Sequence, residues 1–180
     1  LEPISTVIFG LNKLRIKRGE TIVVVGAGTM GIINALIARE YGCRVIISEL
    51  LPKKITVAKN YGFEVINAKE CDPIKKVMEL TDGKGADAVI LAVGAQKATD
   101  QSFEMIKQKR GRILLFAASY PSPKINIDVN TIHYRKMEII GTFGADYRDF
   151  REGQNLINSG KIDFSPVIES RFSFDKMEDA

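Results

Sequence analysis

The sequence predicts an α/β fold in which a doubly wound, six-stranded parallel sheet carries helices on both faces. Short apolar segments typical of buried strands alternate with segments of helical periodicity along the 180 residues. A glycine-rich turn directly follows the first of these apolar segments, and an acidic residue ends the second. This alternation indicates parallel strands that are joined by crossover helices, which cover the sheet on both sides.

Each expected element is bounded by a change of periodicity or by a glycine or proline. The expected helices span residues 4–14, 32–41, 52–60, 73–80, 97–107 and 146–159. The expected strands span residues 21–25, 44–48, 63–66, 86–93, 112–116 and 136–142. Asp72 is expected to cap the helix that opens with Pro73. The prolines at 121 and 123 mark a loop.

The glycine-rich turn lies in the segment Thr21-Ile-Val-Val-Val-Gly-Ala-Gly-Thr-Met-Gly31 and has the spacing G-x-G-x-x-G. Gly26 lets the chain leave the strand in a tight turn, Gly28 leaves room for a pyrophosphate, and Gly31 allows the helix to pack closely on the strand. The first amides of that helix and its dipole favour a phosphate. The strand, turn and helix together predict a Rossmann fold with a dinucleotide site.

Glu49 ends the second expected strand, 18 residues after Gly31. An acid at this place in dinucleotide-binding folds accepts hydrogen bonds from the adenosine ribose hydroxyls. Its carboxylate repels the 2′-phosphate of NADP, so the sequence favours NAD. Two alternatives stay open, since flavin dinucleotides use the same glycine spacing and an acid at a strand end is also compatible with simple solvent exposure.

Composition excludes several classes of protein. Hydrophobic residues make up 45% of the chain and charged residues 27%, as expected of a globular domain with a buried core. The net charge of +4 is small and scattered apart from residues 107–110, so we expect no nucleic-acid partner. The apolar runs are only strand-length, and we expect neither a membrane span nor a signal peptide. Cys43 and Cys71 form no C-x-x-C pair and are expected to be buried, reduced thiols of a cytoplasmic protein.

Catalytic signals are weak. His133 is the single histidine, and its position before the sixth expected strand favours a structural or surface role. The sequence has no cluster with metal-ligand spacing, no Gly-x-Ser-x-Gly elbow and no P-loop lysine. We therefore expect the chain to bind a cofactor without completing a reaction. It begins Leu1-Glu-Pro without an initiator Met, and we expect it to be a piece of a longer protein.

The whole chain resembles the cofactor domain of the medium-chain, zinc-dependent alcohol dehydrogenase family, and most closely its sorbitol and threonine dehydrogenase branch. The likeness runs in register through several motifs, among them the Glu-Pro start, the strand with its glycine turn, and Ala-Val-Gly where the family has Cys-Thr-Gly. The matching segments are 1–4, 17–28, 92–94, 132–135, 141–144 and 160–168.

The resemblance implies roles for individual residues. Those implied to hold the pyrophosphate are Gly26, Gly28, Thr29, Met30 and Gly31. Those implied to contact the adenosine ribose are Glu49 and Lys54. Those implied to border the two riboses are Ala92, Val93 and Gly94. Those implied to lie at the nicotinamide are Phe116, Ala117, Ala118, Thr142 and Phe143. Glu2 matches an acid that lies beside the catalytic zinc in polyol enzymes; zinc itself is expected only in the parent protein.

The resemblance also implies a division of the chain. Residues 1–20 form a helix and turn that arrive from an absent catalytic domain, residues 21–165 form the Rossmann domain, and residues 166–180 begin the return to the catalytic domain. The family often forms dimers or tetramers by joining the strand around Ile113 or the sixth strand to its twin. Residues 121–130, in which Ile125, Ile127 and Val129 alternate with polar residues, are expected to supply an edge strand for such a contact.

For the parent enzyme the resemblance implies hydride transfer between a small secondary alcohol and NAD. Gly144 departs from the family pattern, because polyol enzymes often have an arginine there that helps to hold the substrate; a sorbitol-like grip is therefore in doubt. Two other functions stay open. They are a zinc-free quinone or enoyl reductase of the same superfamily, which Glu49 argues against, and a non-catalytic dinucleotide-binding module.

Overall fold

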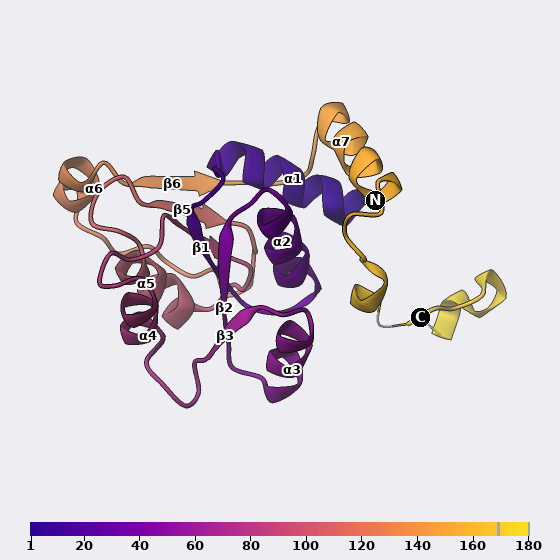
Figure 1. Cartoon of the computed structure of the whole chain (residues 1–180), viewed down its shortest axis with the longest axis horizontal. Helices are drawn as coiled ribbons and strands as arrows, with labels where there is room; N and C mark the ends of the chain where they lie inside the picture. The colour runs from indigo at the N-terminus through magenta and orange to yellow at the C-terminus, as the bar shows by residue number, and fades with distance from the viewer. Residues whose placement is uncertain (169, 180) are drawn as a thin grey trace.

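The computed structural model describes residues 1–168 and 170–179, and a parallel sheet lies between two groups of helices (Figure 1). The six strands follow the order β3-β2-β1-β4-β5-β6, so the strand order reverses between β1 and β4. The strands are β1 (Thr21–Val25), β2 (Arg44–Glu49), β3 (Glu64–Asn67), β4 (Ala88–Leu91), β5 (Arg112–Leu115) and β6 (Glu138–Gly141). The predicted doubly wound fold is confirmed, and ligands bind such sheets in the crevice at the reversal point.

Seven helices cover the sheet. They are α1 (Glu2–Leu14), α2 (Thr29–Glu40), α3 (Pro52–Asn60), α4 (Pro73–Leu80), α5 (Gln96–Met105), α6 (Val129–Arg135) and α7 (Tyr147–Asn158). One face carries α1, α2 and α3, the other carries α4 and α5, and α7 packs on the outer side of α1 (Figure 1). Two short 3₁₀ helices follow, Ser165–Val167 and Phe174–Asp179, and the second lies apart from the sheet.

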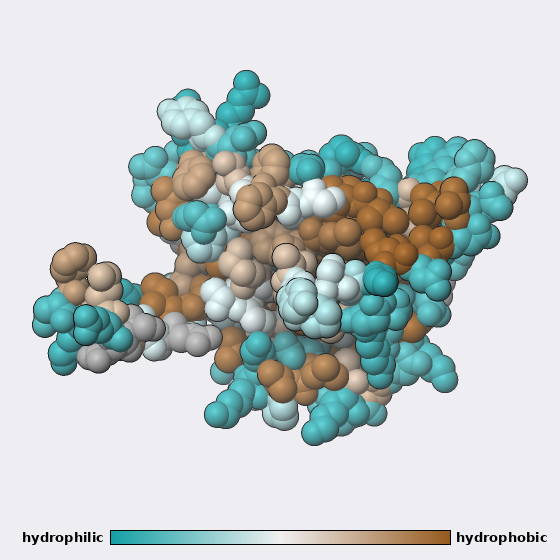
Figure 2. All heavy atoms as spheres, turned by 180° about the vertical axis from the view of Figure 1, so that it is seen from behind, coloured by the Kyte–Doolittle hydropathy of each residue, from teal (hydrophilic) through white to brown (hydrophobic). Residues whose placement is uncertain are grey.

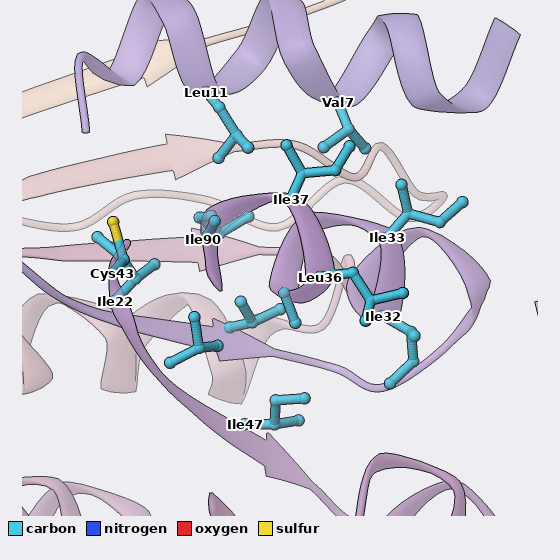
Figure 3. Packing of buried hydrophobic residues seen from close by; sticks show 14 of the residues in the cluster. Val7, Leu11, Ile22, Ile32, Ile33, Leu36, Ile37, Cys43, Ile47 and Ile90 are labelled. Carbon is cyan, nitrogen blue, oxygen red and sulfur yellow. The ribbon is translucent and has the colours of Figure 1, made fainter. Parts of the chain in front are cut away.

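Two apolar cores hold these layers together. On the first face, Val7 and Leu11 of α1 and Ile37 of α2 point toward Ile22 and Ile90 of the strands (Figure 3). The second core combines the opposite sides of β1, β4 and β5 with residues of α4 and α5. Both sides of the central strands are thus buried, which explains their continuous apolar sequences. Each fully buried aliphatic side chain contributes roughly 1.5–3 kcal/mol to folding.

The predicted cap at Asp72 is confirmed, because its Oδ1 accepts hydrogen bonds from the amides of Ile74 (2.9 Å) and Lys75 (3.4 Å). Other expectations were wrong at the ends of elements. β4 is shorter than residues 86–93, since Ala92 and Val93 have already left the sheet and form the turn that leads into α5. The strands expected at 112–116 and 136–142 also end earlier, at Leu115 and Gly141.

The edge strand expected within residues 121–130 was wrong. Residues 116–128 contain no strand, and Val129 begins α6, which the sequence analysis missed. Asp128 caps this helix by accepting a hydrogen bond from the Asn130 amide (2.9 Å). The apolar alternation has another cause, because Ile127 packs on the second core while Val129 is exposed.

The two cysteines differ. Cys43 is buried as expected, whereas Cys71 is exposed because it lies in the bend before α4, so the expectation of two buried thiols was wrong. Both thiols are free. Within the described chain, no helix has the length and apolarity that a membrane crossing requires. Of the expected returning segment 166–180, Glu169 and Ala180 lie outside the described residues.

Candidate functional site

The glycine turn between β1 and α2 has the geometry that the sequence analysis required. Gly26 has a φ of 100°, a left-handed conformation that favours glycine. A Cβ on Gly31 would lie 2.0 Å from the carbonyl oxygen of Gly26, so no side chain fits there. At Gly28 a Cβ would meet only the Lys54 Nζ, at 3.7 Å. Gly31 thus serves packing, whereas Gly28 leaves an open backbone surface.

The first turn of α2 offers unpaired amides at this surface. Gly28 is the N-cap and supplies no side-chain cap, and the first bond within the helix runs from the Ile32 amide to the Gly28 carbonyl (2.9 Å). The amides of Thr29, Met30 and Gly31 therefore have no partner within the helix. The turn also contains no acidic residue. Such a terminus attracts an anion.

Glu49 lies at the end of β2, only 9% exposed, and bridges two turns. Its Oε2 accepts a hydrogen bond from the Ala27 amide (2.7 Å), and its Oε1 accepts from the amides of Leu50 (2.6 Å) and Leu51 (2.9 Å). An ionised carboxylate has about four acceptor positions, so capacity for a hydroxyl donor remains. The carboxylate is an acceptor only, and it opposes a second anion beside it.

A cavity of about 430 Å³ opens between the β1–α2 turn, the β2–α3 turn and the first turns of α5. Six predicted site residues line it: Gly26, Gly28, Glu49, Lys54, Ala92 and Val93. The sequence analysis missed the others. They are Val25, Ser48, Leu50, Leu51, Ala68, Ala95, Lys97, Ala98 and Gln101. Leu50 and Leu51 follow Glu49 directly, and each is about half exposed. Two leucines in a row after the acid were a sequence signal that an apolar surface borders the ligand.

A second cavity of about 250 Å³ adjoins the first and shares Val93 with it. Predicted residues Gly94, Ala117 and Ala118 line this second cavity. The residues that the sequence analysis missed are Leu91, Thr99, Leu115, Ser119, Ser122, Pro123 and Ile125. The two cavities therefore lie next to each other, near the point where the strand order reverses.

The remaining predicted residues line neither cavity. Phe116 packs back toward α1, where a Cβ on Gly10 would lie 3.4 Å from its ring. Phe143 is 98% exposed, and the Thr142 hydroxyl is buried without a hydrogen-bond partner in the described part of the chain. Thr29 is exposed, and the Met30 side chain packs against the first core. This chain therefore does not gather the residues expected at the nicotinamide into one pocket.

The described residues of this chain do not form a zinc site. Among the described residues, no group of three or more His, Cys, Asp or Glu side chains is placed to hold a metal ion. Glu2 lies exposed in the first turn of α1 and accepts a hydrogen bond from the Thr6 hydroxyl (2.8 Å). His133 is exposed on α6, with its ring edge-on to Tyr134 at 5.0 Å.

Residues 29–159 match the family model described as zinc-binding dehydrogenase. The chain belongs to this family. Curated relatives include L-threonine 3-dehydrogenase from Pyrococcus horikoshii, which is 34% identical over 167 residues, or 90% of this chain and 47% of the relative. Sorbitol dehydrogenase from Halalkalibacterium halodurans is 27% identical and covers 99% of this chain and 52% of the relative. The chain thus spans about half the length of the curated relatives it matches.

Solved structures of other dehydrogenases share the fold. One is named a zinc-binding dehydrogenase, comes from Sinorhizobium meliloti 1021 and is bound to NADP; it has a TM-score of 0.89 at 24% identity and covers 99% of this chain and 53% of its own. Benzyl alcohol dehydrogenase from Acinetobacter calcoaceticus has a TM-score of 0.87 at 24% identity and covers 99% and 50%. The resemblance to the cofactor domain of medium-chain alcohol dehydrogenases is thereby confirmed.

Proposed function

We propose that this chain is the NAD(H)-binding half of a zinc-dependent alcohol or polyol dehydrogenase, which transfers hydride between a secondary alcohol and NAD. The observation that carries the proposal is the Glu49 carboxylate. It lies in the wall of the 430 Å³ cavity and is hydrogen-bonded to the glycine turn, at the point where the strand order reverses. A dinucleotide placed there has its anionic and hydroxyl groups matched by groups of this chain.

The adenosine half of the cofactor fits the first cavity part by part. The free amides of Thr29, Met30 and Gly31 suit the pyrophosphate, and Gly28 lets it approach. The Lys54 ammonium lies over the same turn and adds positive charge. Glu49 suits the ribose hydroxyls. The adenine ring then has Leu50 and Leu51 on one side and α5, with Ala98 and Gln101, on the other.

The nicotinamide half continues past Val93 toward the second cavity. Gly94, Ala117 and Ala118 suit the nicotinamide ribose and one face of the ring, because their small size leaves room for the ring to lie against the chain. Phe116, Thr142 and Phe143 follow β5 and β6 at the same end of the sheet. When bound, the nicotinamide supplies the hydride acceptor, and the residues of this chain hold and orient it.

Glu49 leads us to propose NAD rather than NADP as the cofactor. A carboxylate already hydrogen-bonded to three amides has no donor for a 2′-phosphate and repels it. One structural neighbour, 24% identical to this chain, holds NADP. The choice between NAD and NADP is therefore tested by measuring both cofactors on this chain. Titrations of NADH and NADPH followed by nicotinamide fluorescence are expected to show tighter NADH binding. Equal or tighter NADPH binding contradicts the assignment.

The proposal also covers the longer parent protein. We propose that residues 1–20 lead from a catalytic domain, that residues 21–165 bind the cofactor, that residues 166–180 return, and that Glu2 lies near a zinc held by the other domain. Relatives named L-threonine, sorbitol and (R,R)-butanediol dehydrogenases support a small secondary alcohol as substrate. Metal analysis of the complete protein and activity with these alcohols test this; activity that persists after zinc removal favours a zinc-free reductase.

We further propose a cytoplasmic homodimer or homotetramer that is joined through β6. This strand ends the sheet, so its outer edge has no partner strand among the described residues. Apolar surface gathers on the side that carries β6 and α6 (Figure 2), where Ile125 and Val129 are exposed by 40% and 75%. Unpaired edges and apolar patches are typical of sites that a second copy covers. Light scattering at rising concentration tests this, and a persistent monomer shows that the edge is not sufficient.

A further inference from the structure

The loop that covers the second cavity, residues 117–125, is here called the strap. No helix or strand falls within it, as the described chain shows, so its position depends on contacts with its neighbours. The Gln96 side chain makes two of these contacts with one residue. Its Nε2 donates to the Lys124 carbonyl (2.8 Å), and its Oε1 accepts from the Lys124 amide (2.8 Å). The Gln96 side-chain amide thus satisfies both backbone hydrogen-bonding groups of Lys124, as a neighbouring strand would.

A second contact holds the other end of the strap. The Ser119 hydroxyl donates to the Gly94 carbonyl at 2.6 Å, and a Cβ on Gly94 would lie 2.3 Å from the Ser119 side chain. Gly94 lies in the turn between β4 and α5, and Gln96 is the first residue of α5. The strap is therefore fastened at two points, to this turn and to the start of the helix that follows it.

The strap determines the size of the second cavity. Six of the eleven residues that line this cavity belong to it: Ala117, Ala118, Ser119, Ser122, Pro123 and Ile125. The opposite wall consists of β4, β5 and α5 and is rigid, because Leu91 and Thr99 are buried in it. Gln96 itself lines neither cavity, so it can act on them only through the strap.

We propose that Gln96 is a positioning residue for the nicotinamide half of the cofactor. By pairing with Lys124 it holds the strap at the distance that keeps the second cavity open, while the adenosine cavity is formed without it. This inference rests on the proposed function. Gln96 and Lys124 are exposed, so water can replace both bonds in a variant, and the fold does not depend on them. The cost of losing the clamp therefore appears in binding.

The test compares two ligands in the variant Gln96→Ala. ADP reaches only the first cavity and is measured by calorimetry, whereas NADH reaches both and is measured by fluorescence. The Kd for NADH is expected to rise about five- to tenfold, while the Kd for ADP stays within about twofold. Gln154→Ala on α7 is the matched control, because Gln154 is exposed and distant, and both constants are expected to stay unchanged.

The isosteric variant Gln96→Glu keeps the size of the side chain, so it separates the loss of the hydrogen bonds from the loss of side-chain volume. It keeps an acceptor for the Lys124 amide but places a second acceptor against the Lys124 carbonyl and Asp100, so the same selective loss of NADH affinity is expected. An unchanged NADH affinity, or an equal loss for ADP and NADH, overturns the role of Gln96 and leaves the proposed function standing. A wild-type chain that binds neither ligand overturns both.

Discussion

The proposed adenosine half and the proposed nicotinamide half of the candidate site differ in how far the chain alone completes them. In the adenosine half, Glu49 is 9% exposed and both of its oxygens are paired with backbone amides. In the nicotinamide half, Tyr120 and Phe143 are 99% and 98% exposed, and the Thr142 hydroxyl has no partner in the described chain. The first half is lined by paired groups, whereas in the second half Tyr120, Thr142 and Phe143 lie outside the cavity that the strap encloses.

The difference follows from chain connectivity. The glycine turn and Glu49 of the adenosine half belong to one strand–helix–strand unit, residues 21–51, and hydrogen-bond to each other, while the β4–α5 turn and α5 supply the opposite wall of the cavity. The nicotinamide half combines residues 92–94, 116–125 and 142–144, which three separate crossovers bring to one end of the sheet. The polar part of the adenosine half therefore forms within one local unit. A half built from distant loops depends on clamps such as Gln96 and, in the proposed parent enzyme, on a second domain.

The largest expected effect is that of Gly31→Ala in the adenosine half. Its Cβ would meet the Gly26 carbonyl oxygen at 2.0 Å, and this backbone group cannot turn aside as a flexible side chain can, so the free energy of unfolding is expected to fall by about 3 kcal/mol or more. Urea denaturation measures this. The matched control is Gly28→Ala, where a Cβ meets only the Lys54 Nζ at 3.7 Å. It is expected to cost less than about 1 kcal/mol but to abolish ADP binding; a stable Gly31→Ala variant contradicts the account.

A smaller effect is expected for Glu49→Gln. An amide cannot accept all three backbone hydrogen bonds, and its NH₂ group faces a backbone donor, so a loss of about 2–3 kcal/mol in unfolding free energy is expected together with weaker NADH binding. Glu104→Gln on α5 removes the same charge from an exposed site and serves as the control. If both variants retain wild-type stability, Glu49 does not hold the two turns together.

A still smaller effect concerns Asp87, which lies at the end of the sheet opposite the cavity. Burial alone raises the pKa of this carboxyl, but hydrogen bonds from the Lys107 ammonium (2.6 Å) and the Thr21 amide (2.9 Å) outweigh it and lower the pKa below its ordinary value. Its stabilising contribution is therefore complete above about pH 4 and is lost as the pH falls below that value.

Asp87→Asn removes this pH dependence. Unfolding free energies measured between about pH 5 and pH 2.5 are expected to fall less steeply in the variant than in the wild type. ADP affinity at neutral pH is expected to stay the same, because Asp87 pairs at the start of β1 and the cavity lies at its end. Identical pH profiles argue against the Lys107 pairing.

The smallest effect is expected in the nicotinamide half. Phe143→Ala removes a side chain that is 98% exposed, so the unfolding free energy is expected to change by less than about 0.5 kcal/mol. Phe150→Ala on α7, where the ring is half-buried, serves as the contrast and is expected to cost more. A clear loss of stability from Phe143→Ala contradicts the view that this half is open.

Local signals made the glycine turn and its partner acid predictable from the sequence. The structure has the left-handed Gly26, the acid at the end of β2 and the cap at Asp72 where they were expected, while cofactor binding at the first two stays a prediction. Helix α6 escaped prediction, because the alternation of Ile125, Ile127 and Val129 before and at its start has a period of two. The helix has only seven residues, about two turns, and none of them is buried, so it carries no apolar stripe of helical period.

Long-range contacts escaped prediction for another reason. Gln96 and Lys124 are 28 residues apart and are brought together by a crossover, and no spacing in the sequence marks the pair. Lys97 and Gln101 enter the first cavity in the same way, because α5 lies across the point where the strand order reverses. Periodicity predicts which face of a helix is buried, whereas the opposing partner depends on how the elements assemble.

The central claim is that the chain holds a preformed adenosine site and an open nicotinamide site. Backbone amide NMR of the chain, titrated with ADP and then with NADH, tests it most directly. ADP is expected to shift the amide signals of Ala27, Thr29, Gly31 and Leu50 and to leave Thr142 and Phe143 unchanged, whereas NADH is expected to add shifts at Gly94 and Ala117. ADP-induced shifts that spare the glycine turn, or that spread equally to Thr142 and Phe143, contradict the account.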